Sequence, residues 1–172
     1  EAQKLFKIPN EKLDILVHPE SLVHAIVELK NGLTKFIYHE TSMIIPLANA
    51  IFDGELEINK FYKNNKNKKN RPNIKNLTFK EVDKKTFPIY KLKNRVNEHP
   101  STSIIINASN EILVDQFLQK KIPFLSIYKI IMAILNDKNY KKYAIKKPKN
   151  INEILIIDSW ARKRIINKVN NK

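Results

Sequence analysis

The sequence is short of several residue types, and each shortage excludes a class of protein. It has no cysteine, which excludes disulfide bonds and thiolate metal sites. Its two glycines, Gly32 and Gly54, stand too far apart to form a glycine-rich phosphate-binding loop. No apolar run approaches the ~18 residues of a membrane-spanning helix. A cysteine-free chain fits a reducing compartment, and we expect a cytoplasmic protein that has no membrane partner.

The chain also lacks a starting methionine and a signal-peptide pattern, since it opens on Glu1-Ala2-Gln3-Lys4-Leu5-Phe6. These residues are typical of a helix, with Ala2, Leu5 and Phe6 on one face. We therefore expect the sequence to be part of a longer protein.

Basic residues are abundant, and the formal net charge is +15. A charge of this sign suits a nucleic-acid partner, because neutralising phosphates dominates such binding. The lysines, however, are scattered over several segments, together with many Asn and Ile, as in proteins encoded by AT-rich genomes. Only residues 60–75 concentrate them. We therefore do not expect nucleic acid to be the main partner.

The first third of the chain has a β pattern followed by a helix. Apolar and polar residues alternate over 22–29, which predicts a strand with His24 on one of its faces. Asn31-Gly32 favours a tight hairpin, because both residues accept the positive φ that such turns need. The returning strand covers 33–38. A short apolar strand over 13–17 precedes this hairpin, and a helix over 41–52 follows it.

The rest of the chain is predicted to be a linker and a helical bundle. Residues 59–76 are almost all Lys and Asn, which cannot build a core. Four helices follow: one from Phe87 to about Val96, and three that open at Asn107, Pro123 and about Asn150. Asn107 is the predicted N-cap of the second helix. Amphipathic helices joined by short connections indicate a small bundle.

These patterns predict an α+β fold. Residues 1–53 form a partial mixed sheet with helices, at the end of a catalytic domain. Residues 54–76 form a Lys/Asn-rich linker, and residues 77–172 form a small C-terminal helical bundle.

Four patches occur in an order that resembles the 1-deoxy-D-xylulose 5-phosphate reductoisomerases of isoprenoid precursor synthesis. The resemblance covers nearly the whole chain apart from the linker, and it matches the C-terminal portion of that family. The patches are Glu-Ala-x-x-Leu-Phe at 1–6, Leu-Val-His-Pro-Glu-Ser-Leu-Val-His at 16–24, Ser-Met-Ile-Ile-Pro at 42–46, and Leu-Thr-Phe at 77–79 with Phe87-Pro88 and Asn-Ala-Ser-Asn-Glu at 107–111.

The resemblance implies an enzyme that makes 2-C-methyl-D-erythritol 4-phosphate from 1-deoxy-D-xylulose 5-phosphate. Such enzymes are homodimers that use NADPH and Mg²⁺ or Mn²⁺, and the metal acts as a Lewis acid on the oxygens of the substrate. In the family, the cofactor domain and the metal ligands lie upstream of the segment matched here. We therefore expect no metal ligand in this chain, no cofactor bound by it alone, and no activity from it alone.

Three residues carry site roles by this resemblance. His24 corresponds to an active-site histidine, Ser21 to a position that contacts substrate, and Met43 to a methionine near the nicotinamide. Each has an ordinary structural alternative: a hydrogen-bonded histidine in a sheet, a turn-capping serine, and a core methionine. Ser42 and Ile44 replace the usual Asp and Arg of the family, which affects the loop contacts beside Met43.

Two other functions stay open on the sequence. One is a stand-alone basic module that contacts RNA or DNA through residues 59–76. The other is a degenerate homologue with a structural role. A glycine-rich loop and an Asp-x-Glu pair upstream would favour the enzyme over the degenerate homologue.

Overall fold

The computed structural model describes residues 2–55 and 76–170, and it divides the chain into two compact units. One unit is Ile15–Glu81, and the other combines Glu1–Asp14 with Val82–Lys172. Most of the linker predicted at 54–76 lies outside the described residues. The two units are described separately below.

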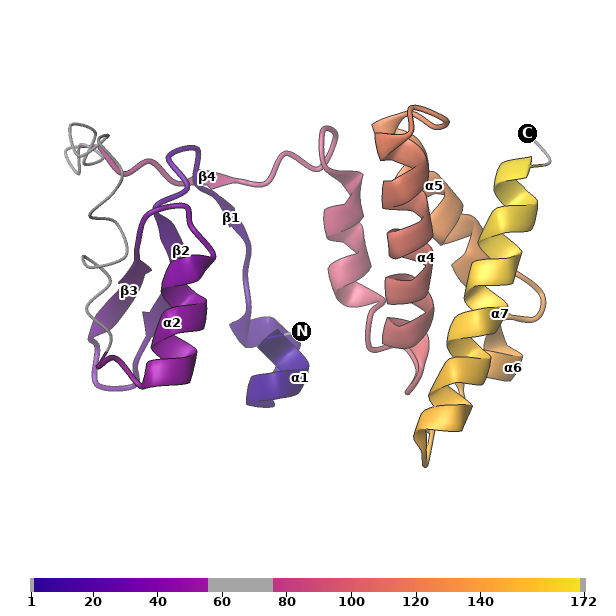
Figure 1. The fold of residues 1–172 in the computed structure, drawn as a ribbon, viewed down its shortest axis with the longest axis horizontal. Coiled ribbons are helices and arrows are strands. Elements are labelled where there is room, and N and C mark those ends of the chain that lie inside the picture. Colours follow the sequence, from indigo (N-terminus) through magenta and orange to yellow (C-terminus); the bar gives the residue numbers. More distant parts are fainter. Residues whose placement is uncertain (1, 56–75, 171–172) are drawn as a thin grey trace. The chain divides into compact units, whose positions relative to one another are not determined.

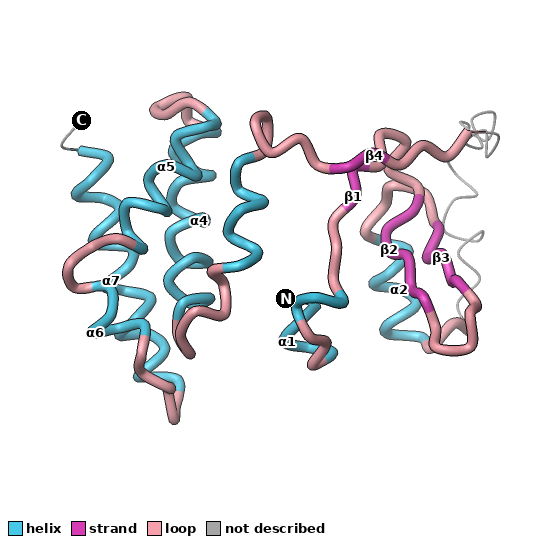
Figure 2. Tube along the Cα trace, turned by 180° about the vertical axis from the view of Figure 1, so that it is seen from behind, coloured by secondary structure: helices cyan, strands magenta, loops and turns pink. Residues whose placement is uncertain are grey.

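The first of these units is built from short antiparallel strand pairs and one helix. β1 pairs with β4, and β2 pairs with β3, so no parallel pair occurs within the described part of the unit. The elements, drawn in Figure 2 with the strands in magenta, are β1 (Leu16–Val17), β2 (Val23–Glu28), β3 (Thr34–Tyr38), α2 (Ile44–Phe52) and β4 (Lys80–Glu81). Together with the helical unit, they confirm the α+β class.

The hairpin between β2 and β3 forms at the predicted place, but of the Asn31-Gly32 pair only Gly32 has a positive φ. Gly32 has a φ of +82°, a left-handed conformation that a glycine adopts without steric cost. The Leu29 amide donates to the Leu33 carbonyl at 2.8 Å, and the Leu33 amide donates to the Asn31 side chain at 3.1 Å. The turn therefore fixes the register of the two strands close to their start.

The register changes once along this hairpin. Glu28 lies opposite Thr34, and the pairing continues to Ala25 opposite Ile37. Val23 then pairs with Tyr38, which leaves His24 as the additional residue of a β-bulge. A bulge of this kind changes the direction of a side chain, and bulges are common beside functional sites.

The second unit is a helical bundle around one apolar core (Figure 1). α4 packs against both α7 and α5. The helices of this unit are α1 (Ala2–Phe6), η1 (Asn10–Lys12), η2 (Pro88–Asn94), α4 (Thr102–Leu118), α5 (Phe124–Leu135), α6 (Tyr140–Ala144) and α7 (Ile151–Asn170). The fully buried side chains at the centre are Ile105, Leu113, Ile131, Ile134, Ile157 and Ile165.

The two longest apolar patterns of the bundle were predicted well. Pro123 stands at the N-cap of α5, and the stripe of Ile127, Ile130, Ile131 and Ile134 is buried as expected. In α7, the expected start near residue 150 is confirmed, and its core residues follow the expected spacing of three to four.

The prediction for the second helix was wrong at its start. α4 begins at Thr102, so Asn107 lies in the interior and not at the N-cap. The Asn107 side chain instead donates to Glu111, one helical turn later, at 3.1 Å. Ser101 and Thr102 are fully buried, and their polar groups are bonded at the helix start. Ser101 stands at the N-cap of α4, and serine and asparagine are both favoured at that position, so the local sequence alone does not decide between the two starts.

Three further boundaries differ from the prediction. The strand expected over 13–17 contains only Leu16–Val17, and the helix expected over 41–52 begins at Ile44. The segment that starts at Phe87-Pro88 is the 3₁₀ helix η2, not an α-helix. Short elements such as these depend on tertiary partners for their extent, because isolated helical turns are unstable in water.

Candidate functional site

The turn between β1 and β2 is the feature that organises the candidate site. The Ser21 amide donates to the His18 carbonyl at 3.0 Å and closes the turn around Pro19. Ser21 has a φ of +55°, a left-handed conformation that is uncommon for residues other than glycine. Such conformations cluster at functional sites, where the surrounding structure holds them. The serine predicted to contact substrate therefore lies at a constrained and solvent-exposed position.

His18 ties this turn to the segment that leads into β4. Its Nδ1 donates to the Thr78 carbonyl at 2.8 Å and lies 3.0 Å from a Glu20 carboxylate oxygen. Its ring stacks on Phe79, with 4.7 Å between the ring centroids. The side chain is only 7% exposed, so His18 is a structural residue that joins two distant parts of the sequence.

Glu20 completes this connection. Its carboxylate accepts hydrogen bonds from the Thr78 hydroxyl at 2.6 Å and from the Thr78 amide at 3.2 Å. The hydroxyl bond is the main reason that the pKa of Glu20 lies below its usual value, with His18 contributing a smaller effect of the same sign. The ionised Glu20 carboxylate therefore links the turn to Thr78.

His24 projects from the bulge and contacts a second histidine. Its ring stacks on His39, with 3.8 Å between the centroids and 8° between the planes. Its Nε2 donates to the His39 carbonyl at 3.3 Å, so in the neutral ring Nδ1 is the accepting nitrogen. The His39 Nδ1 in turn donates to the Glu40 carbonyl at 2.6 Å. His24 is therefore an oriented and exposed imidazole.

Met43 lies at the N-cap of α2, where its side chain is 71% exposed. The neighbouring Ser42 accepts a hydrogen bond from the Ile44 amide at 3.4 Å. The hydrogen bond and ring contact that His24 makes within the described residues both go to His39. The structure thus places Ser21 on the turn before β2, His24 on β2, and Met43 at the start of α2. All three residues belong to the same unit.

Sequence reasoning did not single out His39, although a signal for it existed. Counting outward from the Asn31-Gly32 turn brings His39 to the end of β3, beside the start of β2. The His39 amide donates to the Leu22 carbonyl at 3.0 Å, which continues the ladder past the bulge. Register counting alone would place His39 opposite Val23, on the other face of the hairpin from His24, and it is the bulge at His24 that brings the two rings together.

The described residues offer few groups for binding a metal. Within 2–55 and 76–170, no group of three or more His, Asp or Glu is arranged to hold a metal ion. In the same ranges, no helix is both long enough and apolar enough to span a membrane.

The surface of this unit is unusually apolar. All five residues of β3 are exposed, and so are Ile26 and Val27 of β2. α2 also exposes large apolar side chains, including Leu47 and Ile51. An exposed apolar surface of this extent is typical of a part that packs against further protein.

A model of one protein family matches most of this chain. It is described as the DXP reductoisomerase C-terminal domain, and it matches residues 40–164. The chain belongs to the DXP reductoisomerase family. The matched range includes α2 and most of the helical bundle.

Curated members of the reductoisomerase family align along almost the whole chain. 1-deoxy-D-xylulose 5-phosphate reductoisomerase of Pelagibacter ubique (strain HTCC1062) is 36% identical over 169 residues, which is 96% of this chain and 42% of the relative. The enzyme of the same name from Wolbachia sp. subsp. Drosophila simulans (strain wRi) is 39% identical over 141 residues, covering 80% of this chain and 35% of the relative. The chain therefore spans about two fifths of the length of these relatives.

Solved reductoisomerase structures show the same arrangement. The Zymomonas mobilis enzyme in complex with NADPH has a TM-score of 0.74 at 28% identity, covering 98% of this chain and 42% of that one. A DOX-P reductoisomerase with fosmidomycin and magnesium reaches a TM-score of 0.82 at 25% identity, covering 99% and 42%. The chain corresponds to the C-terminal portion of these enzymes, as its sequence predicted.

Proposed function

We propose that this chain is the C-terminal part of an enzyme that converts 1-deoxy-D-xylulose 5-phosphate to 2-C-methyl-D-erythritol 4-phosphate. The observation that carries the proposal is the alignment of 96% of the chain with a reductoisomerase. The geometry of the His18–His24 segment is consistent with it, because the turn and bulge orient one exposed histidine and one strained serine.

In this proposal, His24 forms one wall of the substrate pocket. The bond from its Nε2 to the His39 carbonyl orients the ring and leaves Nδ1 of the neutral imidazole as an acceptor for a substrate hydroxyl. Ser21 contributes a hydroxyl on the same turn. Met43 contributes an apolar surface near the nicotinamide, which suits its exposure at the start of α2.

The cofactors of the proposed enzyme are NADPH and Mg²⁺ or Mn²⁺. The described residues do not fit either group, since they include no cluster of metal ligands and the sequence has no glycine-rich loop. We therefore assign both groups to the part of the relatives that this chain does not cover. A bound metal supplies Lewis-acid polarisation of substrate oxygens. We expect neither group to bind this chain by itself.

We further propose a homodimer and a cytoplasmic location. The support for a dimer is the strand pair β2–β3, whose backbone edges have no further strand within the described residues. Such edges join other strands readily, and symmetric pairing of this kind builds many dimers. The support for a cytoplasmic location is the absence of cysteine in the sequence.

The proposal is tested with two proteins. The 172-residue chain alone, given substrate, NADPH and Mn²⁺, should show no NADPH oxidation. The product of the complete reading frame that contains this chain should oxidise NADPH in the same assay. In that protein His24→Gln should lower kcat/KM about tenfold, the scale of one lost hydrogen bond to substrate.

A matched control separates chemistry from folding in this test. Asp115→Asn changes one exposed side chain of α4 and should leave kcat/KM unchanged. Turnover by the 172-residue chain would contradict our assignment of the cofactor groups. An inactive product of the complete reading frame would support the degenerate homologue instead.

A further inference from the structure

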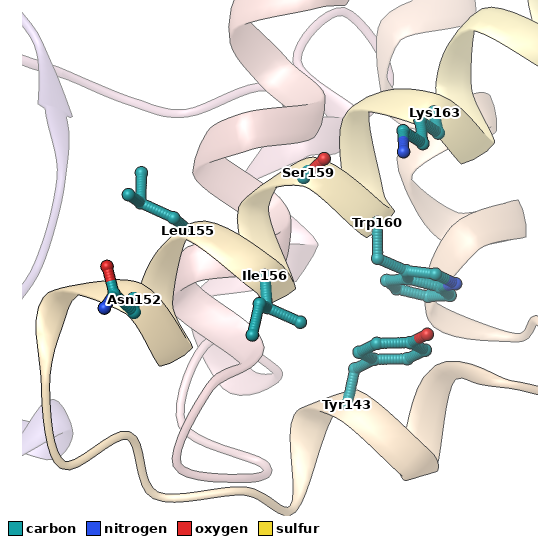
Figure 3. Close-up of a pocket in the computed structure, with 7 residues that line it drawn as sticks. All are labelled: Tyr143, Asn152, Leu155, Ile156, Ser159, Trp160 and Lys163. Carbon is teal, nitrogen blue, oxygen red and sulfur yellow. The ribbon is translucent and has the colours of Figure 1, made fainter.

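α7 and α6 line an open groove on the surface of the bundle (Figure 3). We call it the α7 groove, and its volume is about 630 Å³. All but one of its residues come from α7 and recur every three to four positions, so they form one stripe about three turns long. The residues used below are Tyr143 of α6 with Leu155, Ile156, Ser159, Trp160 and Lys163 of α7.

The floor of the α7 groove is apolar. Tyr143 and Trp160 are stacked, with 4.5 Å between their centroids and 14° between their planes. Leu155 and Ile156 lie on the same stripe and are 57% and 58% exposed. Single exposed apolar residues are ordinary, but a contiguous set with an aromatic wall marks an interaction surface.

The rim of the α7 groove is positively charged. The Nζ atoms of Lys142 and Lys146 each lie 5.9 Å from the centroid of the Tyr143 ring, and Lys163 lines the groove itself. No salt bridge pairs these three lysines with an acidic side chain in the described part of the chain. The nearby carboxylate of Asp158 is instead bound by Arg162.

We propose that the α7 groove binds an acidic amphipathic helix of another protein. An apolar stripe along a helix is matched by the apolar face of a second helix, as in helix-in-groove recognition. The lysine rim is matched by acidic residues on the flanks of that partner helix. This inference is independent of the proposed enzymatic function.

Other occupants fit these observations less well. A second copy of this chain would bring a further +15 charge against the lysine rim. Nucleic acid would place charged phosphates against Leu155 and Ile156. Moving a charge from water to an apolar surface is unfavourable.

Trp160 makes the proposal directly measurable, because it is the only tryptophan in the sequence. The 172-residue chain is titrated with a synthetic amphipathic helical peptide that has leucines on one face and glutamates on its flanks. The control peptide has lysines in place of the glutamates. We expect a saturable change in Trp160 emission with the glutamate peptide, weaker binding as salt is raised, and no change with the lysine peptide.

Variants locate the binding to the groove. Ile156→Ser should weaken the glutamate peptide about tenfold, the loss expected when one aliphatic side chain leaves an apolar contact. Lys163→Glu should weaken it through charge repulsion. Leu118→Ser, at a residue of α4 that is 70% exposed and outside the groove, is the matched control and should bind as the unchanged chain does. Circular dichroism verifies that each variant keeps its helices.

Several results would overturn the proposal. These are no response to the glutamate peptide, an equal response to both peptides, and an unaltered affinity in both groove variants. A larger Trp160 response to phosphatidylglycerol vesicles would assign the groove to a lipid surface. A shift in Trp160 emission with protein concentration alone would assign it to a second copy of the chain.

Discussion

Asp137 provides the sharpest test of how the bundle is held together. Its carboxylate is 4% exposed and follows directly after α5. It accepts hydrogen bonds from Arg164 Nη2 at 2.7 Å and Nε at 3.0 Å, and from the Asn139 amide at 2.9 Å. Asp137→Asn keeps the shape of the side chain but removes its charge, so it isolates the electrostatic part of this contact between the α5–α6 connection and α7.

The expected loss in the free energy of unfolding follows from the number of these hydrogen bonds and from the solvent exposure of the groups that make them. A hydrogen bond to a charged group contributes about 1.5–3 kcal/mol, and Asn can keep the bond from the Asn139 amide. Arg164 is 36% exposed, so solvent screens its share of the interaction. We expect Asp137→Asn to lower the free energy of unfolding by about 2 kcal/mol. For a unit of roughly a hundred residues, this lowers Tm by about 10 °C.

The effect should depend on pH in one direction. Burial raises the pKa of Asp137, but the hydrogen bonds from Asn139 and Arg164 outweigh burial and leave the pKa below its usual value. A carboxyl whose pKa is lowered by folding contributes stability above the unfolded pKa of about 3.9, and that contribution is lost as pH falls through the folded value. The difference between Asp137→Asn and the unchanged chain should therefore be full at pH 7 and shrink as the pH falls below about 4.

The assay is thermal unfolding followed by helical circular dichroism, which reports mainly on the bundle. Asp115→Asn is the control, because it removes the same charge from an exposed position on α4, where changes usually stay within ~0.5 kcal/mol. Equal losses from the two variants at pH 7, or a loss for Asp137→Asn that persists unchanged at low pH, would refute the assigned role of the Asp137–Arg164 contact.

Three further predictions use the same chain. Ile157→Ala should destabilise the bundle by about 2–4 kcal/mol, because Ile157 is 1% exposed. Ile156→Ala, at the exposed neighbour, should cost under ~0.5 kcal/mol. Chemical denaturation measures both variants, and similar losses would contradict the assignment of Ile157 to the buried face of α7. Thr78→Val should raise the pKa of Glu20 toward its usual value, since the hydroxyl bond is lost; carboxyl NMR titration measures it, and an unmoved pKa would count against that bond. Gly32→Ala should destabilise the hairpin by about 1 kcal/mol through its positive φ alone, because no atom lies within 4 Å of an added Cβ; hydrogen exchange of the hairpin amides would show unchanged protection if this is wrong.

Parts of the fold with a strong local signal were predictable from the sequence. The Asn31-Gly32 turn and Pro123 define their elements through backbone conformations that few other residues favour. Long apolar stripes, as in α5, identify helices and their buried faces together. The hairpin, α5 and the start of α7 were therefore predicted close to their observed positions.

Other boundaries were not predictable, because tertiary contacts decide them. Asn107 has the composition of a cap, yet α4 starts at Thr102, whose hydroxyl contacts the Tyr140 hydroxyl at 2.7 Å inside the bundle. α6 is only a short helix, and its Tyr140 and Ala144 are buried in the core of the bundle. Locally, both Asn107 and Ser101, which stands at the α4 N-cap, are favoured cap residues, and packing against residues far away in the sequence decides between them.

The candidate site shows the same division. The sequence alone determined that His24 and Ser21 belong to a strand and a turn, and that the chain resembles the C-terminal portion of a reductoisomerase. Only the tertiary structure showed the bulge that orients His24 against His39, and the bonds from His18 and Glu20 to Thr78. The physical reason is that strand register and long-range hydrogen bonds are pairwise properties. They arise when distant segments meet, whereas turn and helix preferences reside in neighbouring residues.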